Sequence, residues 1–241
     1  ELTGPGTVTP FDQWERILLV SMDDLQPLRG ALLLTVPLLY AVAAFLASWR
    51  VARVCTALAM GLAATSLLLL AWAGPLIIHG FRADALGCIV LLLVCFIGWV
   101  ITRYSQNYMN GQMCGAAGQT RYVRWLMATL AAVAVVVVTN NLVVLALSWV
   151  ATSLALHQLL TFFSSRPAAM IAAHKKFLAS RLGDVCLFAG VGLIGWSLGS
   201  LQIDQVIAKA QALSAYPLAL QVAVFLIVIS ALLKCAQLPV H

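Results

Sequence analysis

Residues 218–241 read LALQVAVFLIVISALLKCAQLPVH, an apolar run that ends in a lysine. A charged side chain inside a membrane segment is costly unless it is paired, neutralised or hydrated. Lys234 therefore indicates a use for buried charge, and the usual use is the movement of ions or protons. Pro239 removes a backbone donor shortly after the lysine, so we expect the helix to break or kink there.

The composition is that of a membrane protein. Of the 241 residues, 63% are hydrophobic and 9% are charged, with a mean hydropathy of +0.99. A soluble domain is about half apolar and about a quarter charged, so the sequence predicts an all-α polytopic membrane protein. The six cysteines lie mostly in apolar runs without CxxC spacing, which indicates buried side chains rather than metal ligands or disulfides. The net charge of +6 does not indicate nucleic-acid binding.

Apolar segments long enough to span a bilayer, about 20 residues each, determine the predicted architecture. Seven spans are expected, at residues 30–49, 54–78, 85–104, 122–139, 141–163, 176–198 and 215–238. The short connection 139–141 predicts an antiparallel hairpin of the fourth and fifth spans, and residues 199–214 suit a short amphipathic surface helix. We expect residues 1–29 outside the membrane, with 11–22 as an interfacial helix, and residues 30–241 as the transmembrane domain.

The basic residues predict the orientation, because cytoplasmic loops carry an excess of lysine and arginine. With seven spans, nine cations fall on one side: Arg50, Arg53, Arg103, Arg121, Arg124, Arg166, Lys175, Lys176 and Arg181. Four fall on the other: Arg16, Arg29, Arg82 and Lys209. The first side is therefore predicted to be cytoplasmic, with the N-terminus outside.

Polar residues within the spans are candidates for an ion path. Arg181 and Asp184 are three residues apart, so they share a helix face and can pair. That pair is either a helix-end ion pair near the interface or part of a proton or cation path with Lys234. The run 174–176, His-Lys-Lys, opens the sixth predicted span, either as a snorkelling flank or as a cytoplasmic proton entry.

A second polar group lies in the fifth predicted span. Ser153, His157 and Thr161 are spaced by four, so they form one polar stripe. The histidine is either hydrogen-bonded to a neighbouring helix or a protonatable relay, because an unperturbed imidazole titrates near neutral pH. No phosphate-binding loop, nucleotide fingerprint or HExxH spacing is present, and no catalytic role is expected for this chain.

Several stretches resemble motifs of the antiporter-like subunits of proton-pumping NADH-quinone oxidoreductases and Mrp antiporters. They are residues 104–111 (YSQNYMNG, for Y-S-x-x-Y-M-x-G), Asn141-Leu142 with Ser148-Trp149 (for N-L…G-W), residues 175–184 (KKFLASRLGD, for K-x-F-x-x-x-R-x-G-D), residues 198–201 (LGSL, for L-G-T-L) and residues 234–241 (KCAQLPVH, for K-S-A-Q-L-P-x-H). The resemblance covers about residues 84–241 and implies that Lys234 is the channel lysine. Family members continue beyond this point, so we expect an N-terminal fragment of a longer antiporter-like subunit.

One position departs from that family pattern. Pumping members have a glutamate directly after the tryptophan of the fifth helix, where this chain has Val150. Residues 149–160 instead resemble the membrane subunits of DAB-type inorganic carbon accumulation complexes (DabB). This resemblance implies a multi-pass protein of the bacterial inner membrane, and the distribution of basic residues then places the N-terminus in the periplasm. The resemblance also implies a large, soluble, zinc-binding, carbonic-anhydrase-like partner (DabA-type) that converts CO2 to bicarbonate, driven by a gradient of H+ or Na+.

Two other functions remain open at this point. One is a subunit of a respiratory complex or an Mrp-type antiporter, and the other is a structural membrane anchor in which Lys234 is merely paired. The expected pathway residues are Lys234, Asp184, His157, Lys175, Lys176, Arg181, Ser153 and His241. Asp184 is expected to be the counter-charge of Lys234. His157 shares a helix face with Val150, about 10 Å along the axis, and is expected to take over part of the missing role.

Overall fold

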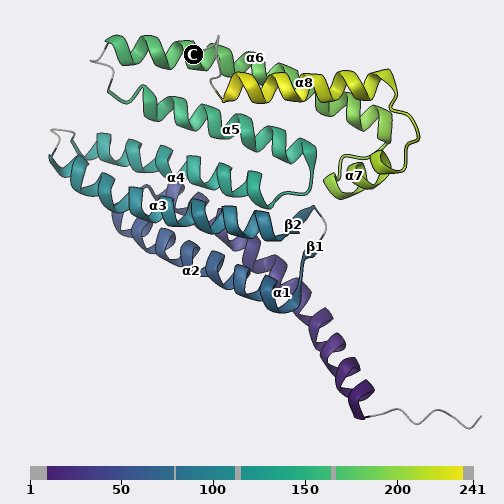
Figure 1. The fold of residues 1–241 in the computed structure, drawn as a ribbon. Helices are drawn as coiled ribbons and strands as arrows, with labels where there is room; N and C mark the ends of the chain where they lie inside the picture. Colours follow the sequence, from purple (N-terminus) through teal and green to yellow (C-terminus); the bar gives the residue numbers. More distant parts are fainter. Residues whose placement is uncertain (1–9, 79, 112–114, 164–166, 236–241) are drawn as a thin grey trace, which may run out of the picture.

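The computed structural model describes residues 10–78, 80–111, 115–163 and 167–235 (Figure 1), with side chains from Gln26 onward. Its elements are α1 (Pro10–Leu46), α2 (Trp49–Ala73), β1 (Leu76–Ile78), β2 (Phe81–Ala83), α3 (Ala85–Gly111), α4 (Ala116–Val138), α5 (Leu142–Leu160), α6 (Pro167–Leu198), α7 (Ile203–Gln211) and α8 (Leu218–Lys234). The predicted all-α fold is confirmed, with one small β-hairpin added.

Six of the described helices are long and apolar enough to cross a membrane by length and composition: α1 from Gln26 onward, and α2 to α6. The seventh expected span corresponds to α8, an apolar helix of 17 residues. This helix ends at Lys234 rather than at residue 238, and its C-cap is Cys235. The break expected at Pro239 lies outside the described residues.

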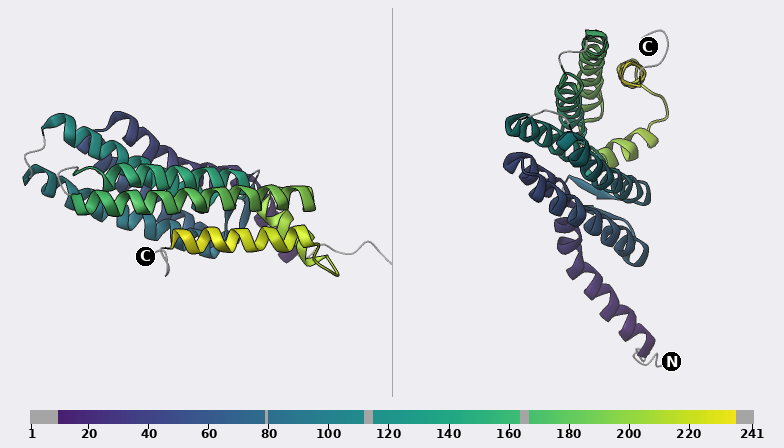
Figure 2. Two further views of the ribbon diagram at one scale, coloured as in Figure 1. Left: turned by 90° about the horizontal axis from the view of Figure 1, so that it is seen from above. Right: turned by 90° about the vertical axis from the view of Figure 1, so that its left-hand side faces the viewer.

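The first helix is longer than the sequence indicated. Residues 11–22 were expected to form a separate interfacial helix, but they belong to α1, which runs for 37 residues and contains Pro27 and Pro37. A proline removes one backbone hydrogen bond and can kink a helix without ending it. The N-terminal part of α1 leads away from the bundle (Figure 2, right). Its location at an interface stays a prediction.

A β-hairpin replaces the end of the second expected span, which was placed at 54–78. Helix α2 ends at Ala73, and Gly74 then adopts a φ of 73°, a conformation that glycine takes without steric cost. Strands β1 and β2 pair antiparallel, with Leu76 opposite Ala83. The prediction of a longer helix was wrong because it followed hydropathy alone, which stays high in Leu76–Ile78 although Gly74 and Pro75 separate that segment from α2.

The connection between α4 and α5 is as short as predicted and joins several elements. Asn141 caps α5, because its side-chain oxygen accepts a hydrogen bond from the Val143 N–H at 2.9 Å. Asn140 is buried; its backbone N–H donates to Gly80 O at 2.7 Å and its side-chain amide donates to Asp204 Oδ1 at 2.7 Å. Asp204 lies in α7, which confirms the predicted short helix. This junction therefore joins the β-hairpin, α4, α5 and α7.

The long helices form two groups that meet at α5 (Figures 1 and 2). Helices α1 to α4 pack around a core in which Tyr40, Leu91 and Met127 are fully buried. Helix α5 packs on α4 on one side and on α6 on the other, and α8 lies along α6. The C-terminal ends of α1, α3 and α5 lie at one end of the bundle, so the long helices alternate in direction as predicted (Figure 1). Which end faces the cytoplasm stays a prediction.

Candidate functional site: a buried charge cluster between α5, α6 and α8

Two glycines of α6 let α8 approach closely. A Cβ atom at Gly190 would lie 3.0 Å from Ala223 O, and one at Gly183 would lie 3.4 Å from Ser230 O. Ala223 and Ser230 are themselves small and buried on α8. Small residues on both helices allow backbones to pack tightly within a membrane. The stem of Lys234 consequently lies directly against α6, with its Cγ 3.5 Å from the position of a Cβ on Gly183.

Lys234 and Asp184 form a buried ion pair. The distance from Lys234 Nζ to Asp184 Oδ1 is 2.5 Å, and the two side chains are 7% and 8% exposed. Burying either charge alone would be strongly unfavourable, whereas the pair compensates both. Lys234 is also in the last turn of α8, where a cation interacts favourably with the helix dipole. The structure therefore brings together the lysine and the acid that the sequence singled out.

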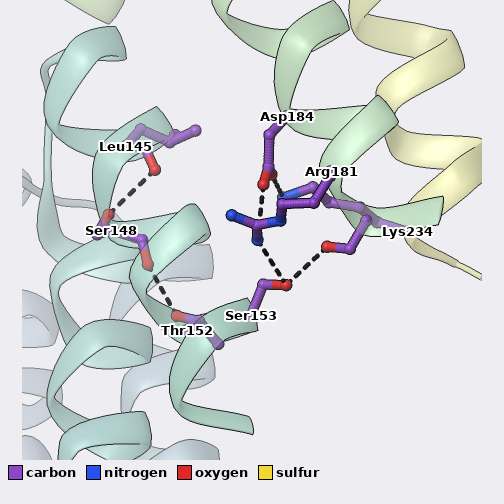
Figure 3. Close-up of polar contacts among 8 residues, drawn as sticks. Leu145, Ser148, Thr152, Ser153, Arg181, Asp184 and Lys234 are labelled. Carbon is purple, nitrogen blue, oxygen red and sulfur yellow. Dashed lines mark hydrogen bonds and ion pairs between the residues drawn. The ribbon is translucent and has the colours of Figure 1, made fainter. Parts of the chain in front are cut away.

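The same carboxylate is shared with a second cation (Figure 3). Arg181 Nη2 lies 2.7 Å from Asp184 Oδ2, in the predicted i,i+3 arrangement. Arg181 also donates to Ser153 Oγ on α5 at 3.1 Å, and Ser153 Oγ is 2.6 Å from Ser180 Oγ on α6. Asp184 is the only acidic residue in the sequences of α5, α6 and α8. One carboxylate thus serves two cations, and the cluster carries net positive charge.

A cleft of about 790 Å³ opens beside this cluster, between α5, α6 and α8. Its polar and charged lining consists of Thr152, Ser153, Lys175, Lys176, Ser180 and Lys234, with Trp149, Leu156, Ile171 and Leu233 among the apolar residues. Lys175 and Lys176 are exposed but share the cleft with the buried Lys234. The predicted entry lysines and the predicted channel lysine therefore line one cleft.

The position of Lys175 and Lys176 in their helix differs from the prediction. They were expected to open the sixth span at residue 176, but α6 begins at Pro167. Proline is favoured in the first turn of a helix, and the alanine-rich sequence of residues 168–173 has high helix propensity. His174, Lys175 and Lys176 consequently lie within the helix, after its first turns.

His157 lies beside the charge cluster rather than in it, because it packs against Phe177, whose ring centroid is 5.1 Å from Arg181 Cζ. Its ring centroid is 4.6 Å from that of Phe177 and 5.7 Å from that of His174, both on α6. Its Nδ1 is buried and has no hydrogen-bond partner within the described structure. Thr161 donates to the backbone oxygen of His157 at 2.9 Å, so it closes the end of α5. The expected polar stripe is therefore divided: Ser153 joins the cluster, whereas His157 packs against aromatic rings. The relay role of His157 stays a prediction.

Two contacts of the cluster were not anticipated. The Trp149 ring centroid lies 5.3 Å from Lys234 Nζ, and Ser180 bonds to Ser153. Ser180 is four residues before Asp184, so helical spacing could have indicated it. No spacing rule indicates Trp149, because it faces a residue on another helix. His241, which was expected in the pathway, lies outside the described residues.

The sequence around this site matches two known protein families. The family described as "NADH:quinone oxidoreductase/Mrp antiporter, TM" matches residues 139–241, and the family described as "NADH-Ubiquinone oxidoreductase (complex I), chain 5 N-terminus" matches residues 77–123. The chain belongs to this antiporter-like family of membrane subunits. The matched regions include the whole of α5, α6 and α8, and thus every described member of the charge cluster.

Curated relatives fall into two branches of the family. The chain is 40% identical over 153 residues to "Probable inorganic carbon transporter subunit DabB" of Hydrogenovibrio crunogenus, covering 64% of this chain and 29% of that protein. It is 31% identical over 166 residues to "NAD(P)H-quinone oxidoreductase subunit 5, chloroplastic" of Zygnema circumcarinatum, covering 67% of this chain and 23% of that protein. The chain thus spans less than a third of the length of these relatives.

A solved structure shows the same fold. A chain of the membrane-bound sulfane sulfur reductase, an archaeal respiratory membrane complex, superposes with a TM-score of 0.71. The match covers 90% of this chain and 46% of that chain, at 16% sequence identity. The helical arrangement is therefore shared with a chain of a respiratory membrane complex. At such low sequence identity, the similarity supports the fold alone.

Proposed function

We propose that this chain belongs to an ion-translocating membrane subunit that couples a gradient of H+ or Na+ to the accumulation of inorganic carbon. The observation that carries the proposal is the buried cluster in which Asp184 is shared by Lys234 and Arg181. Ionisable residues inside a membrane typically mark ion or proton pathways. The greater similarity to a DabB protein than to the chloroplastic subunit favours carbon accumulation over respiration.

The shared carboxylate gives the cluster two states. When Asp184 is ionised, it holds the positive charges of Lys234 and Arg181 together at contact distance. When Asp184 takes up a proton, that attraction disappears and the two cations repel each other in a medium of low dielectric constant. Lys234 then moves away from Arg181 or releases its own proton. The cleft that Lys175 and Lys176 line is the route that we propose for that proton.

The carbon chemistry would take place in a partner. We propose a large, soluble, zinc-binding, carbonic-anhydrase-like subunit that converts CO2 to bicarbonate, while this chain supplies the ion path and no catalytic group. The name of the DabB relative supports a role in inorganic carbon transport. We further propose that the protein resides in the bacterial inner membrane, with its N-terminus in the periplasm.

A respiratory or Mrp-type subunit is the second candidate, supported by the family match and by the similarity to the chloroplastic quinone oxidoreductase subunit. Val150 argues against a respiratory or Mrp-type function, because the pumping subunits that this chain resembles have a glutamate at that position. A structural anchor is a third candidate, in which the cluster only holds α6 and α8 together.

The three candidates are separated by purifying the intact complex and measuring its zinc content and its bicarbonate uptake with and without an uncoupler. Carbon accumulation predicts copurifying zinc and uptake that is lost when the driving gradient is dissipated, by an uncoupler for H+ or by a sodium ionophore for Na+. Quinone-linked electron transfer without zinc would support the respiratory function. Lys234→Ala should abolish uptake. Lys209→Ala is the matched control, because Lys209 is exposed on α7 and its hydrogen bond within the described structure is to Leu198 O. A structural anchor predicts normal ion transport wherever Lys234→Ala assembles.

A further inference from the structure

Trp149 is the residue of α5 that faces the buried lysine. Its ring centroid lies 5.3 Å from Lys234 Nζ, and both residues line the same cleft. An ammonium within about 6 Å of a tryptophan face is attracted by the negative potential of the ring, and tryptophan is the strongest of the aromatic partners. The attraction increases when the cation is removed from water, and the Lys234 side chain is 7% exposed.

The hydroxyl groups of α5 near this lysine are engaged elsewhere. Ser153 accepts a hydrogen bond from Arg181 and contacts Ser180. Thr152 donates to Ser148 O at 2.9 Å, within its own helix. The sequence of α5 contains no acidic residue. The indole face of Trp149 is therefore the attractive surface that α5 offers to the ammonium among the contacts that the structure describes.

We propose that Trp149 is a positioning residue that holds the charged Lys234 on the α5 side of the cleft. This inference rests on the proposed function, because it assigns Trp149 a part in the ion path. An aromatic face attracts the ammonium without accepting its proton, so the proton of Lys234 stays available to Asp184 and to the cleft. When Asp184 is neutral, the ring remains as a partner that keeps the lysine away from Arg181.

The test replaces Trp149 in the intact complex with tryptophans that carry one, two, three and four ring fluorines. Each fluorine weakens the negative potential of the face with little change in ring size. Uncoupler-sensitive bicarbonate uptake should fall stepwise along the series, and Trp149→Leu should lose about tenfold while Trp149→Phe lies between. The same fluorine series at Trp196, which is 80% exposed on α6, is the control and should leave uptake unchanged.

A second measurement does not depend on carbon transport. Only a neutral amine reacts with an acylating reagent, so weakening the ring should increase the labelling rate of Lys234 relative to Lys209 along the same series. A graded effect on both readouts supports the inference. If fluorination changes neither readout, the ring acts only by packing and the inference is overturned, even where Trp149→Leu is inactive. If labelling responds but the unmodified complex shows no bicarbonate uptake that depends on an H+ or Na+ gradient, the proposed function fails, whereas the contact between Trp149 and Lys234 is supported.

Discussion

Replacing Asp184 by asparagine removes the one negative charge of the cluster while preserving the shape of the side chain. Lys234 Nζ at 2.5 Å and Arg181 Nη2 at 2.7 Å both lose their counter-ion. Arg181 is 28% exposed and can turn toward solvent, whereas Lys234 is 7% exposed and cannot do so without moving α8. The loss of stability therefore comes mainly from the buried charge of Lys234, which is left without a counter-ion.

The loss of stability in Asp184→Asn can be estimated from the geometry of the ion pair. Two unit charges 2.5 Å apart attract by about 6 to 7 kcal/mol at an effective dielectric constant of about 20. Part of this attraction offsets the desolvation of both ions, and removing one partner of a buried pair costs about 3–5 kcal/mol. The lysine can lower this cost by giving up its proton. We therefore expect Asp184→Asn to destabilise the protein by about 3 kcal/mol and to lower uptake strongly.

The assay compares unfolding free energy in detergent and ion-driven uptake for Asp184→Asn and for Asp84→Asn. Asp84 pairs with Arg82 at 2.9 Å, but both side chains are about one-third exposed, and Asp84 also accepts from the Gly87 N–H. The side-chain oxygen of an asparagine can accept the same hydrogen bond from the Gly87 N–H, and an exposed ion pair contributes little. Asp84→Asn should therefore lower the unfolding free energy by only about 0–1 kcal/mol. Equal stability and equal uptake for the two variants would refute the reasoning about the shared carboxylate.

Three further predictions concern Lys234, His157 and the contact between α6 and α8. Lys234→Ala should insert and assemble but fail to support growth at ambient CO2; normal growth at normal expression would contradict the pathway role. His157→Phe should impair transport between about pH 6 and 8, with partial rescue by Val150→Glu, and unchanged transport would leave His157 as a packing residue. Gly190→Ala should cost about 1–3 kcal/mol by separating α6 from α8. Gly192→Ala, where a Cβ meets nothing within 4 Å, should not destabilise the protein.

Local spacing predicted the features that depend on one helix or one short connection. The spans follow from the length of the apolar segments, the helical hairpin from the short connection at 139–141, and the pairing of Arg181 with Asp184 from the helical period. Apolar length located α8 but did not fix its end at Lys234, because residues 235–238 are mostly as apolar as those before them. The same ambiguity hid strand β1.

Contacts between helices were harder to predict, because they depend on how the helices cross. A spacing of four placed Ser153 and His157 on one face of α5, but it could not show that α6 presents Ser180 to the first and Phe177 to the second. The Trp149 contact with Lys234 likewise requires the positions of α5 and α8 relative to each other. The close approach at Gly190 is what sets the position of α8.

The junction at Asn140 has a mechanical consequence for α8. Ile203 N–H donates to Asn140 O at 2.7 Å, which pins α7, and the short link after α7 leads directly into α8. Helix α8 is about 25 Å long, is linked to this junction at its first residue and ends at the lysine. A rotation of α8 about that linked end, sliding along α6, would therefore displace Lys234 more than any earlier residue of the helix.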